Sequence, residues 1–479
     1  MRFSNIVILL YVSICSLKAN TQNYEPIKSD LRITKGDNKD LADKLELKLN
    51  TLFNKTMREQ QIPGAAIIIV KDGKVLLKKG YGFTKLGEGI RHVDPDSTIF
   101  RIGSVSKSLT ALSLLQQIDK NKINLHDNVN THLTSFKIKD TYKTSITPFH
   151  LLTHSAGFDE LKGRRVFDEE NLIPLGIFLK DNLKRIRESG EVTAYSTYGI
   201  ALSGLLVENV SGFSLENYMN EHIWKPLKMN MTSITISKKA SPNVALGYEL
   251  HNNINIPQPW EWYHTFPASS INSTVTDMGK YMMMLLNKGS FENQRILSEN
   301  LTNKMLTQQA GLHPETDGFT FGLYKRKWNG ISSVNHGGDM LGYSSFMSLV
   351  PEQSLGVFVV HHHEGTKLRH QAIQTVIDEI VGKSREEKLT AVEEKINEFA
   401  GKYIWLSNCQ TCSAINTQKS WTLKANDDYT ISGFNRKFYK TGPLVFKSTD
   451  GKRTMTFKKD KLGNIKYMSL GNVNVFQKL

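Results

Sequence analysis

In the first 385 residues of this chain, the strand-like segments fall into two groups that lie far apart in the sequence. One group covers residues 65–81 and the other covers residues 318–363. The stretch between about residues 104 and 235 is mainly helix-like. Strands at both ends with helices between them predict one sheet assembled from the N- and C-terminal parts of the chain, beside a helical lobe. We therefore expect a mixed α/β (α+β) fold.

Local signals define the N-terminal half of this sheet. Apolar periodicity predicts a helix over residues 39–60, which Pro63-Gly64 ends. Two strand-like runs then flank Asp72-Gly73, a dipeptide typical of a tight hairpin turn. The first run, residues 65–70, is almost entirely apolar, which indicates a strand covered on both faces. The apolar set of the helix is Leu41, Leu45, Leu47, Leu49, Leu52 and Phe53.

The C-terminal half carries matching signals. Two strand-like runs, at residues 346–350 and 355–360, flank Pro351-Glu352-Gln353-Ser354, which predicts a second hairpin. Residues 367–382 have the spacing of an amphipathic helix. We expect these elements to complete the sheet and cover it.

Ser104 and Lys107 form a Ser-x-x-Lys pair at the start of an apolar, helix-like segment. Residues three apart share a helix face, so the lysine amine can lie beside the serine hydroxyl. A serine hydroxyl becomes a good nucleophile only when a neighbouring group takes its proton. A lysine can do so when burial or a nearby positive charge lowers its pKa. The spacing alone is equally typical of an N-cap serine followed by a solvated lysine.

Two further polar clusters follow at wide intervals. Tyr195-Ser196-Thr197 precedes an apolar, helix-like run, and His336-Gly337-Gly338-Asp339 lies in the second strand-rich region. Taken singly, Tyr195 is typical of a core or surface tyrosine and His336 of a turn residue. The ordered combination of all three clusters is one that chance rarely produces.

With these three motifs, roughly residues 40–385 resemble the serine beta-lactamase and penicillin-binding-protein superfamily, closest to its class C beta-lactamase-like branch (the peptidase family S12 type). That family has Ser-x-x-Lys, Tyr-x-Asn and Lys-Thr-Gly or His-x-Gly in the same order. The resemblance implies an antiparallel sheet flanked by helices, a helical lobe, and chemistry without a metal or other cofactor. Further stretches that look like the branch are residues 151–158, 226–232, 273–278 and 321–323.

The resemblance implies that Ser104 attacks a carbonyl and forms an acyl-enzyme, while Lys107 and Tyr195 share the proton transfers. A tyrosine has an ordinary pKa near 10. We expect the neighbouring lysine ammonium to favour the Tyr195 phenolate, because an opposite charge stabilises the charged form. Which of the two residues is the formal base stays open at this point.

The His-Gly-Gly cluster is expected to bind the substrate at the sheet edge. Gly337 and Gly338 would let the substrate backbone lie against the strand. The backbone N–H groups of Asp339 and Ser104 would form an oxyanion hole. The His336 imidazole would bind a substrate carboxylate or polarise the tyrosine.

Thr197 departs from the family pattern, which has asparagine at this position. An asparagine amide both donates and accepts hydrogen bonds, whereas the threonine hydroxyl is shorter and has one donor. Substrate anchoring at this position is therefore in doubt, and strong beta-lactam turnover becomes a weaker expectation.

Two functional hypotheses follow. The first is an exported serine hydrolase that cleaves an ester, amide or lactam, with an esterase or D-amino-acid peptidase (DD-carboxypeptidase) as well supported as a beta-lactamase. The alternative is a penicillin-binding or wall-polymer-binding receptor with the same fold and little turnover, which Thr197 and the basic surface support. Retention of Ser104, Lys107 and Tyr195 favours the enzyme. Its partner would be a small molecule or peptide with a reactive carbonyl, with cell-wall material as a further candidate.

The N-terminus is typical of an export signal. A positive first segment precedes an apolar run over residues 6–17 and a small residue, Ala19, which predicts a signal peptide at residues 1–19. A polar segment at residues 20–37 follows. We expect a periplasmic or secreted protein with no transmembrane span after signal removal; lipoprotein anchoring through Cys15 is the alternative.

Length and charge limit the remaining possibilities. A chain of 479 residues exceeds one typical domain, and we expect a hydrolase domain at residues 38–385 and a small antiparallel beta domain, such as a barrel, at residues 390–479. The net charge of +15 would suit anionic wall polymers or lipid surfaces. A solvated, lysine-rich surface is the simpler interpretation. The chain shows no nucleic-acid-binding signature.

Three smaller features stay open. Cys409 and Cys412 form either a local disulfide or two free thiols. His361-His362-His363 alternate in direction on a strand, which favours a structural role over shared metal binding. The aromatic segment Pro257, Trp260, Trp262 and Tyr263 fits a pocket wall or a packed surface loop.

Overall fold

The computed structural model describes residues 39–238, 240–382, 392, 394–412, 420–471 and 473–479. The predicted signal peptide at residues 1–19, the polar segment at residues 20–37 and a charged link at residues 385–389 lie outside the described residues. None of the helices in the described ranges has the length and apolar character that crossing a membrane requires.

A six-stranded antiparallel sheet forms the centre of the molecule and joins the two ends of the predicted hydrolase region. Its order is β11-β12-β13-β14-β1-β2, so β1 pairs with β14 although they are far apart in sequence. At the β1–β2 turn, Asp72 and Gly73 both have positive φ, as the Asp-Gly signal predicts. The strands are β1 (Gly64–Lys71), β2 (Lys74–Gly82), β11 (Tyr324–Trp328), β12 (Ile331–Met340), β13 (Tyr343–Val350) and β14 (Leu355–His361).

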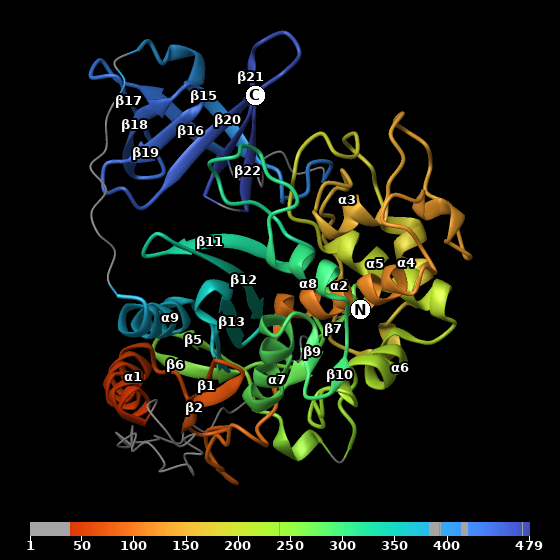
Figure 1. Cartoon of the computed structure of the whole chain (residues 1–479), viewed down its shortest axis with the longest axis vertical. Helices are drawn as coiled ribbons and strands as arrows, with labels where there is room; N and C mark the ends of the chain where they lie inside the picture. The colour runs from red at the N-terminus through yellow and green to blue at the C-terminus, as the bar shows by residue number, and fades with distance from the viewer. Residues whose placement is uncertain (1–38, 239, 383–391, 393, 413–419, 472) are drawn as a thin grey trace, which may run out of the picture.

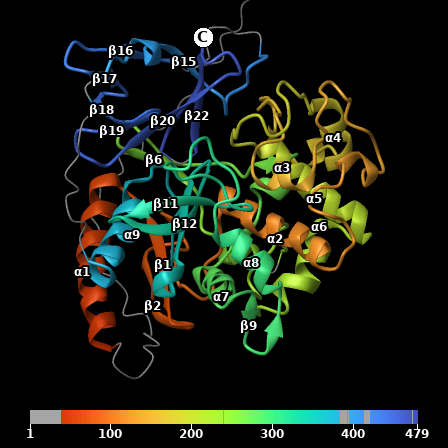
Figure 2. The same cartoon turned by 45° about the horizontal axis from the view of Figure 1, so that its top comes forward.

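Helices cover both faces of this sheet. Ala65, Ile67 and Ile69 pack in one apolar cluster with α1 (Lys39–Gln60) and α9 (Lys367–Ile380), which lie side by side in Figures 1 and 2. The alternate residues of β1 pack in the larger cluster with α2 (Ser106–Asp119) and α7 (Val275–Leu286). The almost continuous apolar run of β1 is therefore explained by burial on both faces.

The first helix contains one exception to the predicted apolar face. Leu47 is 70% exposed, whereas Leu45, Leu49 and Phe53 are buried. Leu47 lies two residues from each of these leucines, and positions two apart do not share a helix face.

The remaining helices and short strands come from the part of the sequence between the two halves of the sheet; α3, α4, α5 and α6 lie on the right in Figure 1, whereas β5 and β6 lie further left. The helices are α2 (Ser106–Asp119), α3 (Pro148–Leu152), α4 (Leu175–Asn182), α5 (Thr197–Ser211), α6 (Leu215–Met219), α7 (Val275–Leu286) and α8 (Glu299–Leu306). The short strands are β3 (Phe100–Arg101), β4 (Arg165–Val166), β5 (Tyr248–His251), β6 (Ile254–Pro257), β7 (Trp262–Tyr263), β8 (Asn272–Ser273), β9 (Ser290–Phe291) and β10 (Gln294–Arg295).

The C-terminal region forms a closed eight-stranded antiparallel barrel, drawn in blue above β11 in Figure 1. Its interior is filled by an apolar cluster rich in phenylalanine, which includes Phe399, Phe446 and Phe457. The strands are β15 (Gly401–Trp405), β16 (Ser420–Ala425), β17 (Thr430–Gly433), β18 (Arg436–Gly442), β19 (Val445–Ser448), β20 (Thr454–Lys459), β21 (Ile465–Leu470) and β22 (Asn474–Lys478).

A close backbone contact fixes the segment after β3 against β12. The Ile102 carbonyl accepts a hydrogen bond from Ser345 Oγ at 2.8 Å. A Cβ atom on Gly338 would lie 2.0 Å from that carbonyl oxygen, so only glycine permits this approach. Gly103 has a φ of +55°, and a Cβ there would lie 3.0 Å from Asp339 N. The turn that carries Ser104 is therefore held directly against the His-Gly-Gly strand.

We predict that Gly338→Ala lowers the free energy of unfolding by roughly 1–3 kcal/mol, because the new methyl group overlaps the Ile102 carbonyl. Gly337→Ala is the matched control: its Cβ would meet side-chain atoms and no backbone, the Phe346 ring at 3.3 Å and Arg369 Nη2 at 3.6 Å. Urea unfolding of both variants measures the difference. Equal losses in the two variants would contradict this account of the contact.

Candidate functional site

The Ser104 hydroxyl lies beside the Lys107 amine, as the Ser-x-x-Lys spacing predicts. Ser104 lies in a helical turn, η1 (Gly103–Val105), that continues directly into α2. Lys107 Nζ is 3.0 Å from Ser104 Oγ and 2.8 Å from the Ala268 carbonyl oxygen. The Lys107 residue is only 1% exposed. The solvated lysine that the spacing alone permitted is therefore excluded.

Burial changes the protonation of Lys107. Loss of water contact disfavours the ammonium form and lowers the pKa of Lys107 to about 7. The Glu160 carboxylate opposes this shift, and the Arg164 guanidinium adds to it. A substantial fraction of the lysine is therefore the neutral amine, which can accept a proton, near neutral pH.

Tyr195 completes the group around the serine. Its hydroxyl hydrogen-bonds to Ser104, and Lys107 Nζ lies 5.0 Å from its ring centroid. Burial raises the pKa of Tyr195 well above its ordinary value, and the hydrogen bond to Ser104 only partly offsets this. The expected preference for the phenolate is therefore wrong in direction, because desolvation outweighs any effect of the lysine. The tyrosine keeps its proton.

His154 packs against the ring of Tyr195. The two rings stack with centroids 4.7 Å apart, and Phe319 lies on the same histidine at 4.6 Å. His154 Nδ1 accepts a hydrogen bond from the Ser196 N–H at 3.0 Å. Burial holds the pKa of His154 well below its ordinary value, so this ring is neutral. The histidine thus fixes both the ring and the backbone of the tyrosine segment.

Thr197 is the first residue of α5, and its backbone N–H donates to Glu160 Oε1 at 2.7 Å. A carboxylate at the N-terminus of a helix is stabilised by the helix dipole. Glu160 Oε2 also pairs with Arg164 Nη1 at 2.5 Å. No local motif marks Glu160, since nothing in the pattern around it connects it with a helix that begins 37 residues later.

His336 lies on β12 with its ring near Tyr195 and Tyr324, at centroid distances of 5.9 and 5.4 Å. Its Nδ1 is 2.7 Å from the Gly337 carbonyl oxygen. Because a carbonyl can only accept, Nδ1 carries the proton and Nε2 presents a lone pair. Within the described residues, Nε2 is buried without a hydrogen-bond partner. Burial lowers the pKa of His336 to about 3, so the ring is a neutral acceptor.

The Asp339 position is braced from α9. Arg369 Nη1 and Nη2 bind the two Asp339 carboxylate oxygens at 2.7 and 3.0 Å. Arg369 Nη1 also donates to the carbonyl groups of Gly338 and Ser345, at 2.8 and 2.7 Å. The guanidinium thus holds the β12 backbone beside the serine turn. No local motif marks Arg369, because its partners lie on other elements.

A cavity of about 710 Å³ opens elsewhere in the described region, and none of Ser104, Lys107 or Tyr195 lines it. Its walls include Trp260, Trp262 and Tyr263, as one of the two interpretations of the aromatic segment predicts; Pro257 is not among them. Arg101, three residues before Ser104, and Ser270, two residues after Ala268, also line it.

Comparison with known proteins places this site in a family. The family model described as Beta-lactamase matches residues 49–381. "Protein flp" of Staphylococcus aureus (strain MW2) is 27% identical over 328 residues, which cover 67% of this chain and 64% of the relative. The chain thus spans less than two thirds of that relative's length. "Putative penicillin-binding protein PbpX" of Bacillus subtilis (strain 168) is 26% identical over 62% of this chain and 76% of its own.

Solved structures share the fold. The octameric penicillin-binding protein homologue from Pyrococcus abyssi superposes with a TM-score of 0.62 and 24% identity, covering 90% of this chain and all of that chain. The structure titled SurE superposes with a TM-score of 0.65 and 16% identity, covering 91% of this chain and all of that chain. The fold class expected from the sequence is thereby confirmed. With the family model matching well over half of its length, the chain belongs to the beta-lactamase family, the serine hydrolase superfamily that includes the penicillin-binding proteins.

Proposed function

We propose that this protein is an exported serine hydrolase that cleaves an ester, amide or lactam through an acyl-enzyme on Ser104. The observation that carries the proposal is the buried Lys107 amine, 3.0 Å from the Ser104 hydroxyl and with a pKa lowered to about 7. A neutral amine at hydrogen-bond distance is a competent general base. The other polar groups of the site support this assignment.

In the proposed acylation step, Lys107 takes the Ser104 proton as Oγ bonds to the substrate carbonyl carbon. The oxyanion that develops is bound by the backbone N–H groups of Ser104 and Asp339. The close contact of Gly103 with Asp339 N supports a shared position for these two donors. Arg369 acts through the Asp339 carboxylate to hold the second donor in place.

The leaving group receives its proton from Tyr195, which burial keeps protonated. The Lys107 ammonium formed in the first half-step then restores the tyrosine proton. In deacylation the transfers run in reverse: water loses a proton through the same pair and attacks the acyl carbon, and Ser104 regains its proton. This order makes Lys107 the base and Tyr195 the acid of acylation.

The substrate is inferred from the charges around the site. His336 is a neutral hydrogen-bond acceptor, which disfavours its role as a binder of a substrate carboxylate and favours a hydroxyl or amide donor. Thr197 replaces the family asparagine, and its N–H is already bound to Glu160. We therefore place an ester or amide ahead of a beta-lactam carboxylate. Gly337 and Gly338 would border the substrate.

Two wider inferences accompany this proposal. The predicted signal peptide and the relatives named as penicillin-binding proteins support an extracytoplasmic location. We also propose the domain division at residues 38–385 and 390–479, with the barrel as the second domain. The alternative function, a receptor that is acylated but turns over little, would use the same Ser104.

Ser104→Ala is the first test of the proposed function. We expect the wild-type protein to hydrolyse at least one of three probes, a short nitrophenyl ester, a D-alanyl-D-alanine peptide or a chromogenic cephalosporin, and the variant to lose that activity because it lacks the nucleophile. Labelling by a fluorophosphonate should disappear with it. Labelling without turnover in the wild type would favour the receptor, and labelling that persists in the variant would remove Ser104 from the proposed role.

Tyr195→Phe tests the proton route. Loss of a positioned general acid lowers kcat by about 10²–10⁴-fold, while we expect KM to change little, since the ring and its stacking are kept. Tyr198→Phe is the matched control, because its hydroxyl makes only a 3.5 Å contact with the Leu161 carbonyl in the helical region. Steady-state kinetics on the same substrate compare the two. A rise in KM alone would make Tyr195 an anchor.

The pH dependence tests the base. Protonation inactivates Lys107, so kcat/KM on a non-ionisable ester should fall as pH decreases through about 7 and reach a plateau above it. His154 and His336 stay neutral across this range because burial lowers their pKa values, and Tyr195 keeps its proton. A midpoint below 5 or above 9 would contradict the assignment of Lys107.

A further inference from the structure

The C-terminal barrel contacts three segments that surround Tyr195, and a buried carboxylate makes the first contact. Asp159 is 1% exposed, and it belongs to the predicted hydrolase region rather than to the barrel. Its Oδ2 accepts hydrogen bonds from the Thr411 N–H at 3.0 Å and the Thr411 hydroxyl at 2.7 Å. Its Oδ1 accepts from the Gln410 N–H at 2.7 Å. These donors lie in the loop that the Cys409–Cys412 disulfide closes.

The same carboxylate is connected to the tyrosine segment. Asp159 Oδ1 also accepts from the Glu160 N–H at 3.0 Å, so one oxygen joins the barrel loop to Glu160. Glu160 in turn accepts from the Thr197 N–H at 2.7 Å. Thr197 lies two residues after Tyr195. Hydrogen bonds on both sides of Glu160 therefore link the disulfide loop to Thr197.

A second barrel contact involves the residues that precede Tyr195 in the chain. Glu191 Oε1 binds Lys466 Nζ at 2.5 Å and the Tyr467 hydroxyl at 2.8 Å. The Glu191 carbonyl accepts from Lys458 Nζ at 2.6 Å. Val192 and Ala194, which lead directly to Tyr195, pack in an apolar cluster with barrel residues. That cluster consists of Val192, Ala194, Leu406, Tyr467 and Val475, with Leu312 against it.

The third contact is made by the segment that leads to Phe319. Thr316 Oγ1 is 3.3 Å from Thr456 Oγ1 of β20. Phe319 then packs on His154, the histidine that stacks on Tyr195. The barrel thus contacts the segment before Tyr195 and the segment that leads to Phe319. Through Asp159 and Glu160 it is also linked to Thr197, after the tyrosine.

We propose that the C-terminal barrel is a positioning part of the active site, and that Asp159, bound by the disulfide loop, is the residue through which it holds Tyr195 in place. The kinetic consequence rests on the proposed function. A general acid contributes fully only when its reacting atom is held within a fraction of an ångström. Four hydrogen-bond donors around one buried carboxylate give Asp159 that rigidity.

Asp159→Asn in the full-length protein tests this inference. An amide can satisfy the Gln410 and Glu160 donors, but its NH₂ group would face the Thr411 N–H and disrupt the loop contact. We expect kcat, and the rate of Ser104 labelling by a fluorophosphonate, to fall about tenfold, with KM within about twofold of wild type. Hydrogen exchange in peptides covering residues 192–199 should become faster.

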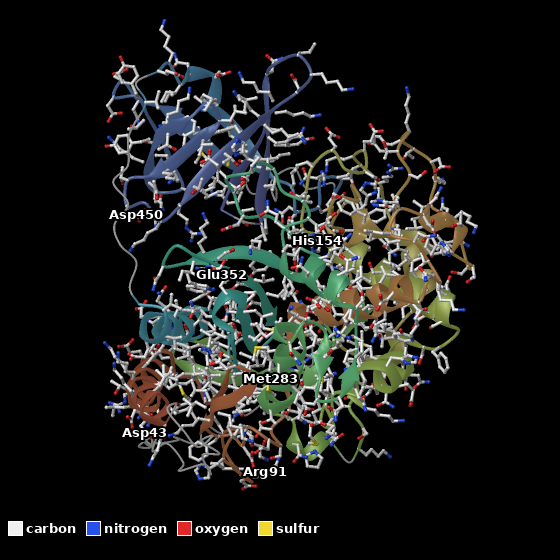
Figure 3. The ribbon with its side chains drawn as sticks, viewed as in Figure 1. Asp43, Arg91, His154, Met283, Glu352 and Asp450 are labelled. Carbon is white, nitrogen blue, oxygen red and sulfur yellow. A yellow bond between two sulfur atoms is a disulfide. The ribbon has the colours of Figure 1, made fainter. Side chains whose placement is uncertain are left out.

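Asp450→Asn is the matched control. Asp450 binds Ser448, Lys452 and Arg436, all within the barrel, and Figure 3 labels it on the barrel well apart from His154. We expect wild-type labelling and exchange in residues 192–199 for this variant. A double variant, Cys409→Ser with Cys412→Ser, keeps every donor to Asp159 but frees the loop, and should move both readouts in the same direction by a smaller factor.

The outcomes separate the two proposals. If the wild type is not labelled at Ser104, the proposed function fails, and hydrogen exchange alone decides whether Asp159 positions the segment. If the wild type is labelled and Asp159→Asn matches it in labelling rate and exchange, the inference is overturned. Equal slowing in Asp159→Asn and Asp450→Asn would also overturn it, because the effect would then be general destabilisation.

Discussion

The contact of a buried lysine amine with a serine hydroxyl is the constraint around which this structure is arranged. Burying an ammonium group is costly, and the neutral form is favoured when water is removed. Burial on all sides favours this state for Lys107, whose amine also donates to the Ala268 carbonyl. Glu160 is near enough to oppose the shift, and it is itself paired with Arg164. The site thus keeps an uncharged base without leaving a carboxylate unpaired beside it.

Two separate sheets bring the rest of the site to this pair. Ser104 follows β3, which pairs with β8, whereas the proposed oxyanion strand β12 belongs to the central sheet. They meet where the Gly338 backbone lies against the Ile102 carbonyl, a separation that a side chain would prevent. Arg369, from a helix on one face of the sheet, then binds the backbone of the same strand. This close contact between segments far apart in the sequence therefore sets the geometry around Ser104.

Much of the fold could be predicted from local sequence. The Asp72-Gly73 turn, both hairpins, the first and last helices of the sheet layer and the Ser-x-x-Lys contact all depend on residues close in the chain. The predictions that failed depend on three-dimensional surroundings. Tyr195 was expected to favour its phenolate because a lysine is near, but the degree of burial decides its pKa, and burial is not readable from Tyr-Ser-Thr. Local sequence does not predict the contacts of Glu160, Arg369 and Asp159, because each binds a partner from a distant element.

The barrel affects the site in two ways, through burial and through position. A tyrosine that must stay protonated needs a dry environment, and the segment before it, residues 191–194, would be open to water without the barrel cluster that packs on it. Dryness and position thus have one origin, since the contacts that exclude water from this segment also hold its backbone. The Asp159 carboxylate extends this link to the far side of the tyrosine. On this proposal, the state of the tyrosine that acts as general acid is set jointly by two regions of the chain that a sequence motif search treats as independent.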